Sequence, residues 1–406
     1  MEADIKIADR GEHQSLMEPL LIGEGSRHRP ALTDLALDVT RKSAGLRRSL
    51  PPSMLTSLAD LVRSMNCYYS NLIEGHDTHP IDIERALKND YSKDARKRDL
   101  QLEAKAHIAV QAWIDRGGLT GGQAMTPEGM CDIHRRFGEL LPEDLLWAED
   151  AVTGERVRMA PGELRTRDVR VGRHIAISPG AVPRFLARFA AVYRKAGRTE
   201  SIISTAAAHH RLLWIHPFPD GNGRVARLMS HAVLLETLDT GAVWPVARGL
   251  ARNVSQYKIL LANCDLPRRN DLDGRGSLSE EALAEFTRFF LTVCIDQVDF
   301  MESLLQPDRL RTRIMLWAEE EIRMGALPPQ SGNILEALLS RGELPRGEAA
   351  TLAGTGERQA RRIVSSLLAK EVLVSERPRA PAGSRRRIAL ATRASADNRA
   401  RRIRMP

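Results

Sequence analysis

The residues from His216 to Leu228, His-Pro-Phe-Pro-Asp-Gly-Asn-Gly-Arg-Val-Ala-Arg-Leu, combine side chains that phosphate chemistry requires. Pro217 disfavours helical geometry at the residue before it, so a helix should end at His216 and present its imidazole to a cleft. Gly221 and Gly223 allow a positive φ and a close approach of the backbone, as in the amide nests that bind anions. A second helix should begin near Gly223 and point its free N–H groups at the same place.

Two arginines and one carboxylate complete this set. Arg224 and Arg227 are three residues apart, which places both forked guanidinium groups on one face of the second helix. Asp220 is a hard oxygen ligand of the kind that Mg²⁺ prefers beside phosphates. His216 is a histidine, with an ordinary pKa of about 6.5, and would act as the general base that removes a proton from an attacking hydroxyl. Together these residues predict phosphoryl or nucleotidyl transfer, in which positioning and charge stabilisation supply most of the catalysis.

Each of these residues has a simpler structural explanation when it is taken alone. A histidine before proline is usually structural, a Gly-x-Gly is usually a turn, and arginines three apart usually form a solvated face. His209 and His210 lie upstream without an H-E-x-x-H pattern, so positions on a helix face are favoured over zinc ligands. A calcium loop beginning at Asp220 is disfavoured, because Arg224 follows and no glutamate closes a twelve-residue loop. It is the combination within one short segment that favours a functional site.

The segment from His216 to Arg227 resembles the signature of the Fic family, H-x-F-x-[D/E]-G-N-G-R-x-x-R, at every fixed position. Members of this family mostly transfer AMP from ATP to a hydroxyl of a target protein and use Mg²⁺. The resemblance implies that His216 is the base and that Asp220 holds the metal. It implies that Arg227 binds the γ-phosphate, and that the α- and β-phosphates are bound by the preceding residues of the loop: Gly221, Asn222, Gly223 and Arg224. The intact Gly-Asn-Gly-Arg favours AMP over other transferred groups.

A second motif lies upstream. Ser70-Asn-Leu-Ile-Glu74-Gly75 resembles the inhibitory motif of the family, [S/T]-x-x-x-[E/D]-[G/N], in the subgroup that carries it N-terminal to the catalytic domain. Glu74 is expected to pair bidentately with Arg227 and so to keep it from the γ-phosphate. Leaving a buried ion pair half-broken costs about 3–5 kcal/mol, which would lower activity by about two to three orders of magnitude. Two alternatives stay open: Glu74 is one of many surface carboxylates, or it orients a water that removes AMP, as in some relatives.

The rest of the chain supplies the elements that must position these residues. Apolar residues at steps of three and four, such as Leu55, Leu58 and Met65, predict a helix that begins after Pro51-Pro52 and ends at Gly75. Further helices are expected over 96–116, 127–141, 181–195, 200–215, 223–238, 250–264 and 278–304. The predicted fold class is mainly α: a Fic-type helical bundle with a β-hairpin flap, plus a small winged helix-turn-helix domain.

Composition shifts and Pro/Gly-rich stretches, with Pro328-Pro329 as the expected boundary, divide the chain. The predicted divisions are a loosely ordered N-terminal segment (1–50), an N-terminal helical region with the inhibitory motif (51–95), a Fic catalytic domain (96–305), a linker helix (306–330), a winged-helix-like domain (331–392) and a basic tail (393–406).

Two features are expected to contact the substrates. Residues 167–178, with Gly162-Glu-Leu-Arg165 ahead of them, resemble the flap of the family; a hairpin turning at Gly172-Arg173 would offer a free strand edge to an extended target segment. An ordinary hairpin that closes the fold is the alternative. Tyr257 is predicted to pack on adenine, against the alternative that an aromatic at helical spacing belongs to the core.

The C-terminal region is similar to a winged helix. Helices are expected at Ile334 to Leu339, Arg346 to Leu352 and Gly356 to Lys370, followed by strands at 372–375 and 386–390. Arg358, Arg361 and Arg362 on the third helix suit contacts with DNA phosphates, although many such modules mediate protein contacts or dimerisation instead. Residues 377–406 hold ten arginines and one acid, whereas the chain as a whole has a net charge of +8, so the basic character belongs to the tail.

Composition limits the class of protein. The chain of 406 residues is 43% hydrophobic and 28% charged, as in globular proteins, and has no apolar run of the roughly 18 residues needed to cross a membrane. The N-terminus lacks a basic stretch followed by an apolar one, which argues against a secretory signal. The four cysteines are far apart, which argues against disulfides and zinc and predicts a cytoplasmic protein.

These observations predict a nucleotidyltransferase: a protein adenylyltransferase that transfers AMP from ATP to a Ser, Thr or Tyr hydroxyl, inhibited by Glu74 on Arg227. Its expected partners are ATP, Mg²⁺ and a target protein docked on the 167–178 flap. The alternatives are a DNA-binding regulator that uses the Fic body as a nucleotide sensor, and a Fic enzyme that removes AMP. DNA binding by the winged-helix-like domain and a homodimer are left open by the sequence.

Overall fold

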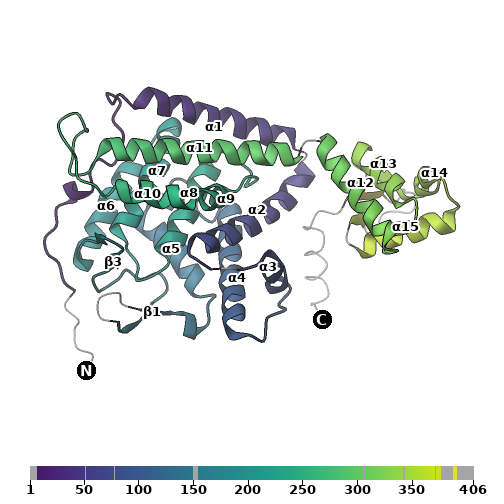
Figure 1. Ribbon diagram of the computed structural model, residues 1–406, viewed down its shortest axis with the longest axis horizontal. Helices are drawn as coiled ribbons and strands as arrows, with labels where there is room; N and C mark the ends of the chain where they lie inside the picture. The colour runs from purple at the N-terminus through teal and green to yellow at the C-terminus, as the bar shows by residue number, and fades with distance from the viewer. Residues whose placement is uncertain are drawn as a thin grey trace. The chain divides into compact units, whose positions relative to one another are not determined.

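The computed structural model describes residues 7–50, 52–76, 78–149, 154–305, 307–341, 343–370, 372–375 and 387–390 (Figure 1). It forms two compact units: one runs to Leu50 and again from Leu58 to Asp299, and the other holds Pro51–Ser57 and the chain from Phe300 onward. The predicted basic tail (393–406) and the turn between the two predicted C-terminal strands lie outside the described residues.

The first unit is a helical bundle, as predicted. Its helices, two of which (α2 and α11) continue into the second unit, are α1 (Arg29–Ser49), α2 (Pro52–Ile73), α3 (Pro80–Leu87), α4 (Ala95–Asp115), α5 (Pro127–Gly138), α6 (Val182–Tyr193), α7 (Arg198–Ile215), α8 (Asn222–Leu238), α9 (Val246–Arg252), α10 (Val254–Asn263) and α11 (Glu280–Leu305). Short 3₁₀ turns lie at Gln14–Met17, Gln123–Met125, Glu143–Leu145 and Pro179–Ala181. Helices α7 and α8 are packed against each other and buried along most of their length, which makes them the centre of the bundle.

Two antiparallel hairpins lie on the first unit. Strand β3 (Arg170–Val171) pairs with β4 (His174–Ile175) inside the predicted flap, so this hairpin is confirmed. Strand β1 (Trp147–Glu149) pairs with β2 (Arg156–Arg158), and we did not predict this second hairpin. Its strands have three residues each, too few to show the alternation of apolar and polar residues by which a strand is recognised.

The prediction of a loosely ordered segment over 1–50 is wrong for its second half, because residues 29–49 form α1. Proline in the first turn favours the start of this helix. Its buried residues recur at alternating steps of four and three, as on one helix face: Leu32, Ala36, Val39, Ser43 and Leu46. In the sequence, the glycine-containing stretch directly before the helix obscures this pattern.

Residues 8–12, which we call the N-terminal strap, are bound to the base of the flap. The Arg10 guanidinium donates to both carboxylate oxygens of Asp168, at 2.8 and 2.9 Å. The Glu12 carboxylate accepts from the backbone N–H of Ser178 at 2.7 Å and from its hydroxyl at 2.5 Å. Asp168 and Ser178 stand on either side of the β3–β4 hairpin, so the strap anchors both of its ends.

The second unit combines helices with a small antiparallel sheet. Its elements are α12 (Pro307–Arg323), α13 (Ser331–Arg341), β5 (Glu343–Pro345), a 3₁₀ turn (Arg346–Glu348), α14 (Ala349–Ala353), α15 (Glu357–Ala369), β6 (Leu373–Ser375) and β7 (Arg387–Leu390), with strand order β5-β7-β6. Three helices followed by two strands were expected after residue 330; β5 was not.

Two predicted boundaries need correction. The division between the units lies at Asp299–Phe300, inside α11, and not at Pro328-Pro329. Helix α12 is not a linker, because its apolar residues pack into the core of the second unit at helical spacing: Ile314, Trp317, Ala318 and Ile322. In the part of the chain that the structure describes, no helix is long and apolar enough to cross a membrane.

We expect Glu12→Ala to loosen the flap, because it leaves the Ser178 N–H without its acceptor, which destabilises a buried donor by about 1–3 kcal/mol. Hydrogen exchange of the Ser178 amide should speed up, while exchange in α7 and α8 should not change. Glu24→Ala, which removes an exposed carboxylate elsewhere in the N-terminal segment, is the control. Equal exchange of Ser178 in both variants would contradict an anchoring role of the strap.

Candidate functional site

His216 stands between the two central helices. Helix α7 ends at Ile215 as predicted, and His216 adopts a left-handed conformation with φ 51° and ψ 63° instead of the extended one expected before proline. Its Nδ1 lies 3.3 Å from the carbonyl oxygen of Leu213. A carbonyl only accepts, so Nδ1 carries the proton and Nε2 keeps its lone pair. This is the tautomer that a general base needs.

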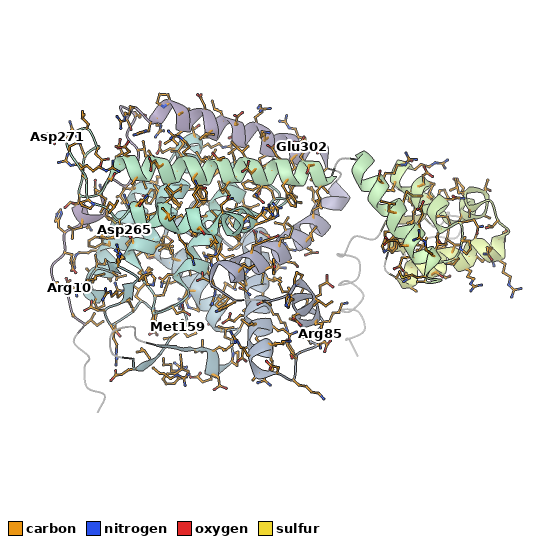
Figure 2. All side chains as sticks on the ribbon, in the orientation of Figure 1. Arg10, Arg85, Met159, Asp265, Asp271 and Glu302 are labelled. Atoms are coloured by element: carbon orange, nitrogen blue, oxygen red, sulfur yellow. The ribbon has the colours of Figure 1, made fainter. Side chains whose placement is uncertain are left out.

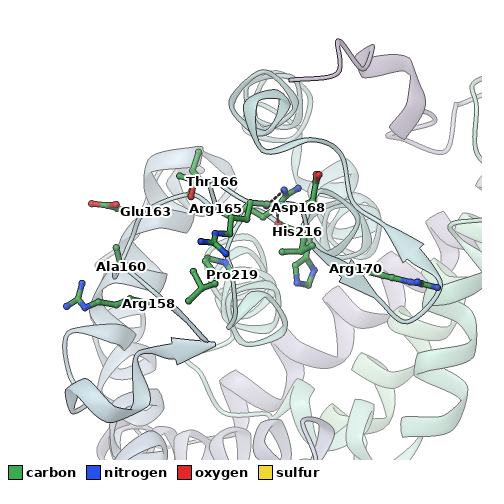
Figure 3. A pocket seen from close by; sticks show the side chains of 13 residues that line it. Arg158, Ala160, Glu163, Arg165, Thr166, Asp168, Arg170, His216 and Pro219 are labelled. Carbon is green, nitrogen blue, oxygen red and sulfur yellow. Dashed lines mark hydrogen bonds between the residues drawn. The ribbon is translucent and has the colours of Figure 1, made fainter. Parts of the chain in front are cut away.

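A pocket of about 170 Å³ opens beside His216 (Figure 3). Its walls are strand β2, the segment from Glu163 to Arg170 that leads into the flap hairpin, and Pro219 of the loop. The imidazole therefore faces a cavity next to the flap. Burial lowers the pKa of His216 to about 4, so the ring is neutral and able to accept a proton at physiological pH.

Arg165 holds the loop and the flap together, and the sequence had not singled out its side chain. The residue is 3% exposed. Its guanidinium donates to four carbonyl oxygens: His216 at 2.8 Å, Arg167 at 2.9 Å, Ile177 at 2.5 Å and Ile215 at 3.4 Å. Burial lowers the pKa of Arg165 to about 10. A buried arginine whose donors bind the backbone fixes the position of His216 relative to both ends of the hairpin.

The glycine loop behaves partly as expected. Gly221 has the predicted positive φ, +80°, directly before α8. Gly223 does not; it is helical, and its lack of a side chain makes room for Glu74, because a Cβ there would overlap Oε1 of that residue. The Asn222 side chain closes the loop, accepting from the N–H of Phe218 at 3.0 Å and donating to its carbonyl at 2.8 Å. The backbone N–H of Asn222, in the first turn of α8, is thus the part of this residue that is placed to meet an anion.

The structure brings Glu74 and Arg227 together. Nη2 of Arg227 forms an ion pair with Oε1 of Glu74, and Nε of Arg227 donates to the Ser70 hydroxyl at 2.8 Å. The expected bidentate pair is therefore replaced by one bond to each of two motif residues, the serine and the glutamate. Burial alone would raise the pKa of Glu74, but the charge and hydrogen bond of Arg227 outweigh it and lower the pKa. Glu74 is ionised at neutral pH.

Arg224 lies one turn before Arg227 on α8 and has different partners. Its guanidinium carbon lies over the Phe137 ring, 4.9 Å from the ring centre, and Nη2 lies 3.6 Å from Oε2 of Glu103 on α4. The side chains of Arg224 and Glu103 are only 10% and 14% exposed. Both arginines of the signature thus face a carboxylate in this structure. Nothing in the sequence marks Glu103, since one acid among several on a helix is unremarkable.

Residues 124–234, which run from α5 through the flap to α8, match the family model Fic/DOC. The chain carries a Fic/DOC-family domain. Glu74 and Glu103 lie outside the matched range.

Curated relatives of this Fic domain are named "Protein adenylyltransferase Fic". The protein from Culex quinquefasciatus is 28% identical over 170 residues, which cover 41% of this chain and 31% of that protein. The protein from Drosophila ananassae is 32% identical over 245 residues, which cover 58% of this chain and 46% of that protein. The chain therefore spans less than half the length of these relatives.

The fold is also found among solved structures. The crystal structure of a Fic family protein from Desulfovibrio desulfuricans G20 superposes with a TM-score of 0.51 at 16% identity. The match covers 89% of this chain and 96% of that one, so the similarity of fold extends beyond the Fic domain.

Asp220 of the Fic domain is exposed at the mouth of the loop, and its carboxylate forms no hydrogen bond with the described residues. Those residues contain no cluster of three histidine, cysteine or acidic side chains that could hold a metal ion. Mg²⁺ commonly takes one or two carboxylates and completes its shell with waters and substrate phosphates. A single free carboxylate beside a phosphate site fits this mode of binding, and it would not hold a metal alone.

Tyr257 corrects one prediction. Its ring is 2% exposed and packs beside Phe286, and its hydroxyl lies 2.7 Å from Nε2 of His209. Burial raises the pKa of Tyr257 to about 12. The residue belongs to the core of the first unit, as in the alternative given for an aromatic at helical spacing, and its ring is enclosed there instead of facing adenine. His209 and His210 are likewise buried and hydrogen-bonded inside the bundle.

We expect the His216 ring to titrate near pH 4. A histidine whose pKa is lowered by burial is neutral above that value and takes up a proton only as the pH falls through it. NMR of ring-labelled histidine should therefore show no change at His216 between pH 6 and 8. Assignment of the signal through a His216→Ala spectrum is the control. A midpoint above pH 6 would contradict the buried, neutral base.

Proposed function

We propose that this protein is a protein adenylyltransferase that moves AMP from ATP to a Ser, Thr or Tyr hydroxyl of a target protein. The observation that carries the proposal is the placement of His216: a neutral imidazole opens into a pocket beside the flap, directly before a glycine loop with two arginines. The names of the curated relatives support the same activity.

The chemistry follows from the groups in place. Nε2 of His216 takes the proton of the target hydroxyl, and the oxygen attacks the α-phosphorus of ATP. The new bond joins that oxygen to phosphorus, and the bond from the α-phosphorus to the oxygen that bridges to the β-phosphate breaks, so pyrophosphate leaves. Arg224, Arg227 and the first N–H groups of α8 would hold the phosphates. Mg²⁺, held by Asp220 and the phosphates, would supply further charge neutralisation.

We infer that Glu74 inhibits this reaction. In the described state Arg227 is bound by both Ser70 and Glu74, so it is not free to hold a γ-phosphate. A nucleotide sensor, the rival function, would need the arginines but not a general base or a metal ligand. His216 opens into the pocket and Asp220 is exposed, which favours the enzyme. Removal of AMP with a water oriented by Glu74 is the remaining alternative, and the following experiment separates it.

We expect Glu74→Gly to raise AMP incorporation from labelled ATP and Mg²⁺ by about one to two orders of magnitude, the effect of freeing an arginine that is 5% exposed from a carboxylate that is itself 34% exposed. Auto-modification and modification of proteins in a cell lysate are both measured. Glu24→Gly, which removes an exposed carboxylate, should behave as the parent protein.

The double variant Glu74→Gly with His216→Ala should lose the incorporated label, and Glu74→Gly with Asp220→Ala should lose most of it. Equal incorporation in the parent and Glu74→Gly proteins would remove the inhibitory role. Loss of label from modified protein on adding the parent enzyme, but not the Glu74→Gly form, would favour AMP removal.

We propose that the target docks on the flap. Apolar side chains of the hairpin, Val171 and Ile175, are 46% and 68% exposed. The hairpin has two strands in the part of the chain described here, which leaves a free edge for an extended target segment. Pairing at this edge would bring a target hydroxyl toward His216 with little demand on the target sequence.

We also propose that the second unit is a winged helix that contacts DNA. Arg358, Arg361 and Arg362 are exposed on α15, the third helix before the β6 and β7 strands. Arg361 pairs with Glu357, and both side chains are about four-fifths exposed, so this pair contributes little and leaves the arginine able to bind phosphate. Contact with a protein is the alternative. A reducing compartment such as the cytoplasm is supported by four unpaired thiols, and a homodimer stays a prediction.

We expect replacement of Arg358, Arg361 and Arg362 by alanine to weaken binding of duplex DNA. The slope of log affinity against log salt should fall by about one for each DNA phosphate that the variant no longer neutralises. Electrophoretic mobility shifts at several salt concentrations measure this. Replacement of Arg311, Arg323 and Arg341, which are exposed on α12 and α13, removes the same charge and is the control. Equal weakening in both triple variants would point to general charge attraction, to which the tail arginines contribute.

A further inference from the structure

Glu103 lies between the inhibitory segment and the phosphate-binding loop. Its Oε2 accepts a hydrogen bond from Nδ1 of His76 at 3.0 Å and lies 3.6 Å from Nη2 of Arg224. The side chain is 14% exposed, so His76 and Arg224, more than water, surround the carboxylate. Figure 2 shows all the described side chains of this region on the ribbon.

The charge state of Glu103 follows from these partners. Burial by itself would raise the pKa of the Glu103 carboxyl, but the hydrogen bond from His76 and the charges of Arg224 and His76 outweigh it and lower the pKa. Glu103 is therefore ionised at neutral pH. A buried carboxylate of this kind competes with phosphate for Arg224, just as Glu74 competes for Arg227.

His76 connects this pair to Glu74. It lies two residues after Glu74, in the turn that follows α2, and its N–H donates to the carbonyl of Asn71 at 2.9 Å. The turn is thus held to the bundle at two points. Glu74 forms an ion pair with Arg227 of α8, and His76 forms a hydrogen bond with Glu103 of α4. We propose that Glu103 is a second carboxylate of the inhibitory device, which holds Arg224 directly and anchors the turn carrying Glu74 through His76.

This inference deepens the proposed function and rests on it. A triphosphate that enters the loop must displace a carboxylate from both arginines. Once Glu103 leaves Arg224 and His76, the turn loses one of its two attachments, so the release of Glu74 becomes easier. Release of Arg224 from Glu103 is in this way coupled through His76 to release of Arg227 from Glu74, and not only through the helix that the two arginines share.

The anchor depends on pH. The groups facing His76 are Glu103 of α4, Arg224 of α8 and Glu74 of its own segment. The hydrogen bond to Glu103 raises the pKa of His76, with Arg224 opposing and Glu74 assisting. The charge-assisted bond is therefore strongest below this raised pKa and weakens as the pH rises through it. His216 titrates far lower, near pH 4, so the two effects do not overlap.

The test uses the full chain with Glu103→Gln, which keeps the shape of the side chain and removes its charge. We expect about tenfold tighter binding of MgATP by calorimetry, because the variant weakens both the ion pair of Glu103 with Arg224 and its hydrogen bond with His76. Amide exchange at Gly75 and His76 should speed up several-fold in the protein without nucleotide. His79→Ala, an exposed histidine three residues further on, should change neither quantity.

Combined variants distinguish the two roles of Glu103. In the Glu74→Gly background, His76→Ala should have no further effect on MgATP binding, because it acts only through the turn. Glu103→Gln should keep part of its effect there, because it also frees Arg224. Weaker MgATP binding by Glu103→Gln in both backgrounds would overturn the proposal and make Glu103 a positioning residue for Arg224. If Glu103→Gln does not fold, amide hydrogen exchange of the turn is measured in His76→Ala. Faster exchange at Gly75 supports the anchor, and unchanged exchange contradicts it.

The pH arm compares the parent protein with His76→Ala between pH 6 and 9. MgATP should bind more tightly to the parent protein as the pH rises, and the difference from His76→Ala should shrink. If the difference in MgATP affinity between the parent protein and His76→Ala stayed constant from pH 6 to 9, the proposed pH dependence would be wrong. Failure of Glu74→Gly to incorporate AMP would reject the proposed function, whereas the exchange of the turn, which needs no nucleotide, tests the anchor by itself.

Discussion

The ion pair between Arg227 and Glu74 is the interaction around which this site is arranged. It requires a helix, α2, that ends at the right point and a glycine at 223 that leaves room for the carboxylate. It also requires a serine one turn before Glu74, whose hydroxyl accepts from Nε of Arg227. An arginine that is 5% exposed at its side chain needs such partners, because an unpaired buried charge is costly. A triphosphate can supply the same negative charge to Arg227 as Glu74 does. Inhibition and substrate binding therefore depend on one property, the need of a buried guanidinium for an anionic partner.

The chemistry of the loop was readable because its information is local. Pro217 ends a helix, Gly221 permits a left-handed turn, and α8 starts one residue later, all within a few positions of His216. Spacing along one helix likewise predicts that Arg224 and Arg227 share a face. The resemblance to the Fic family added roles for these residues, and the pairing of Glu74 with Arg227 could be expected only from that resemblance.

What the sequence did not reveal depends on contacts between distant segments. Arg165, Glu103 and Glu12 look like ordinary surface charges until the fold places them against backbone carbonyls, an arginine and a serine. The prediction that Tyr257 packs on adenine is wrong for a different reason. A tyrosine on a helix looks the same in the sequence whether its ring contacts a ligand or the core, and here the ring packs beside Phe286. The missed β1–β2 hairpin and α1 show that short strands and a nearby glycine-rich stretch weaken periodicity as a guide.

The strap has a consequence for how the flap is acquired during synthesis. Arg10 and Glu12 precede their partners Asp168 and Ser178 by 158 and 166 residues. Contacts at such separation close late, because the intervening chain must first be brought into place. Both partners nonetheless precede His216 in the chain, so a growing polypeptide contains the strap and the flap, the platform on which a target is expected to lie, before it contains the glycine loop.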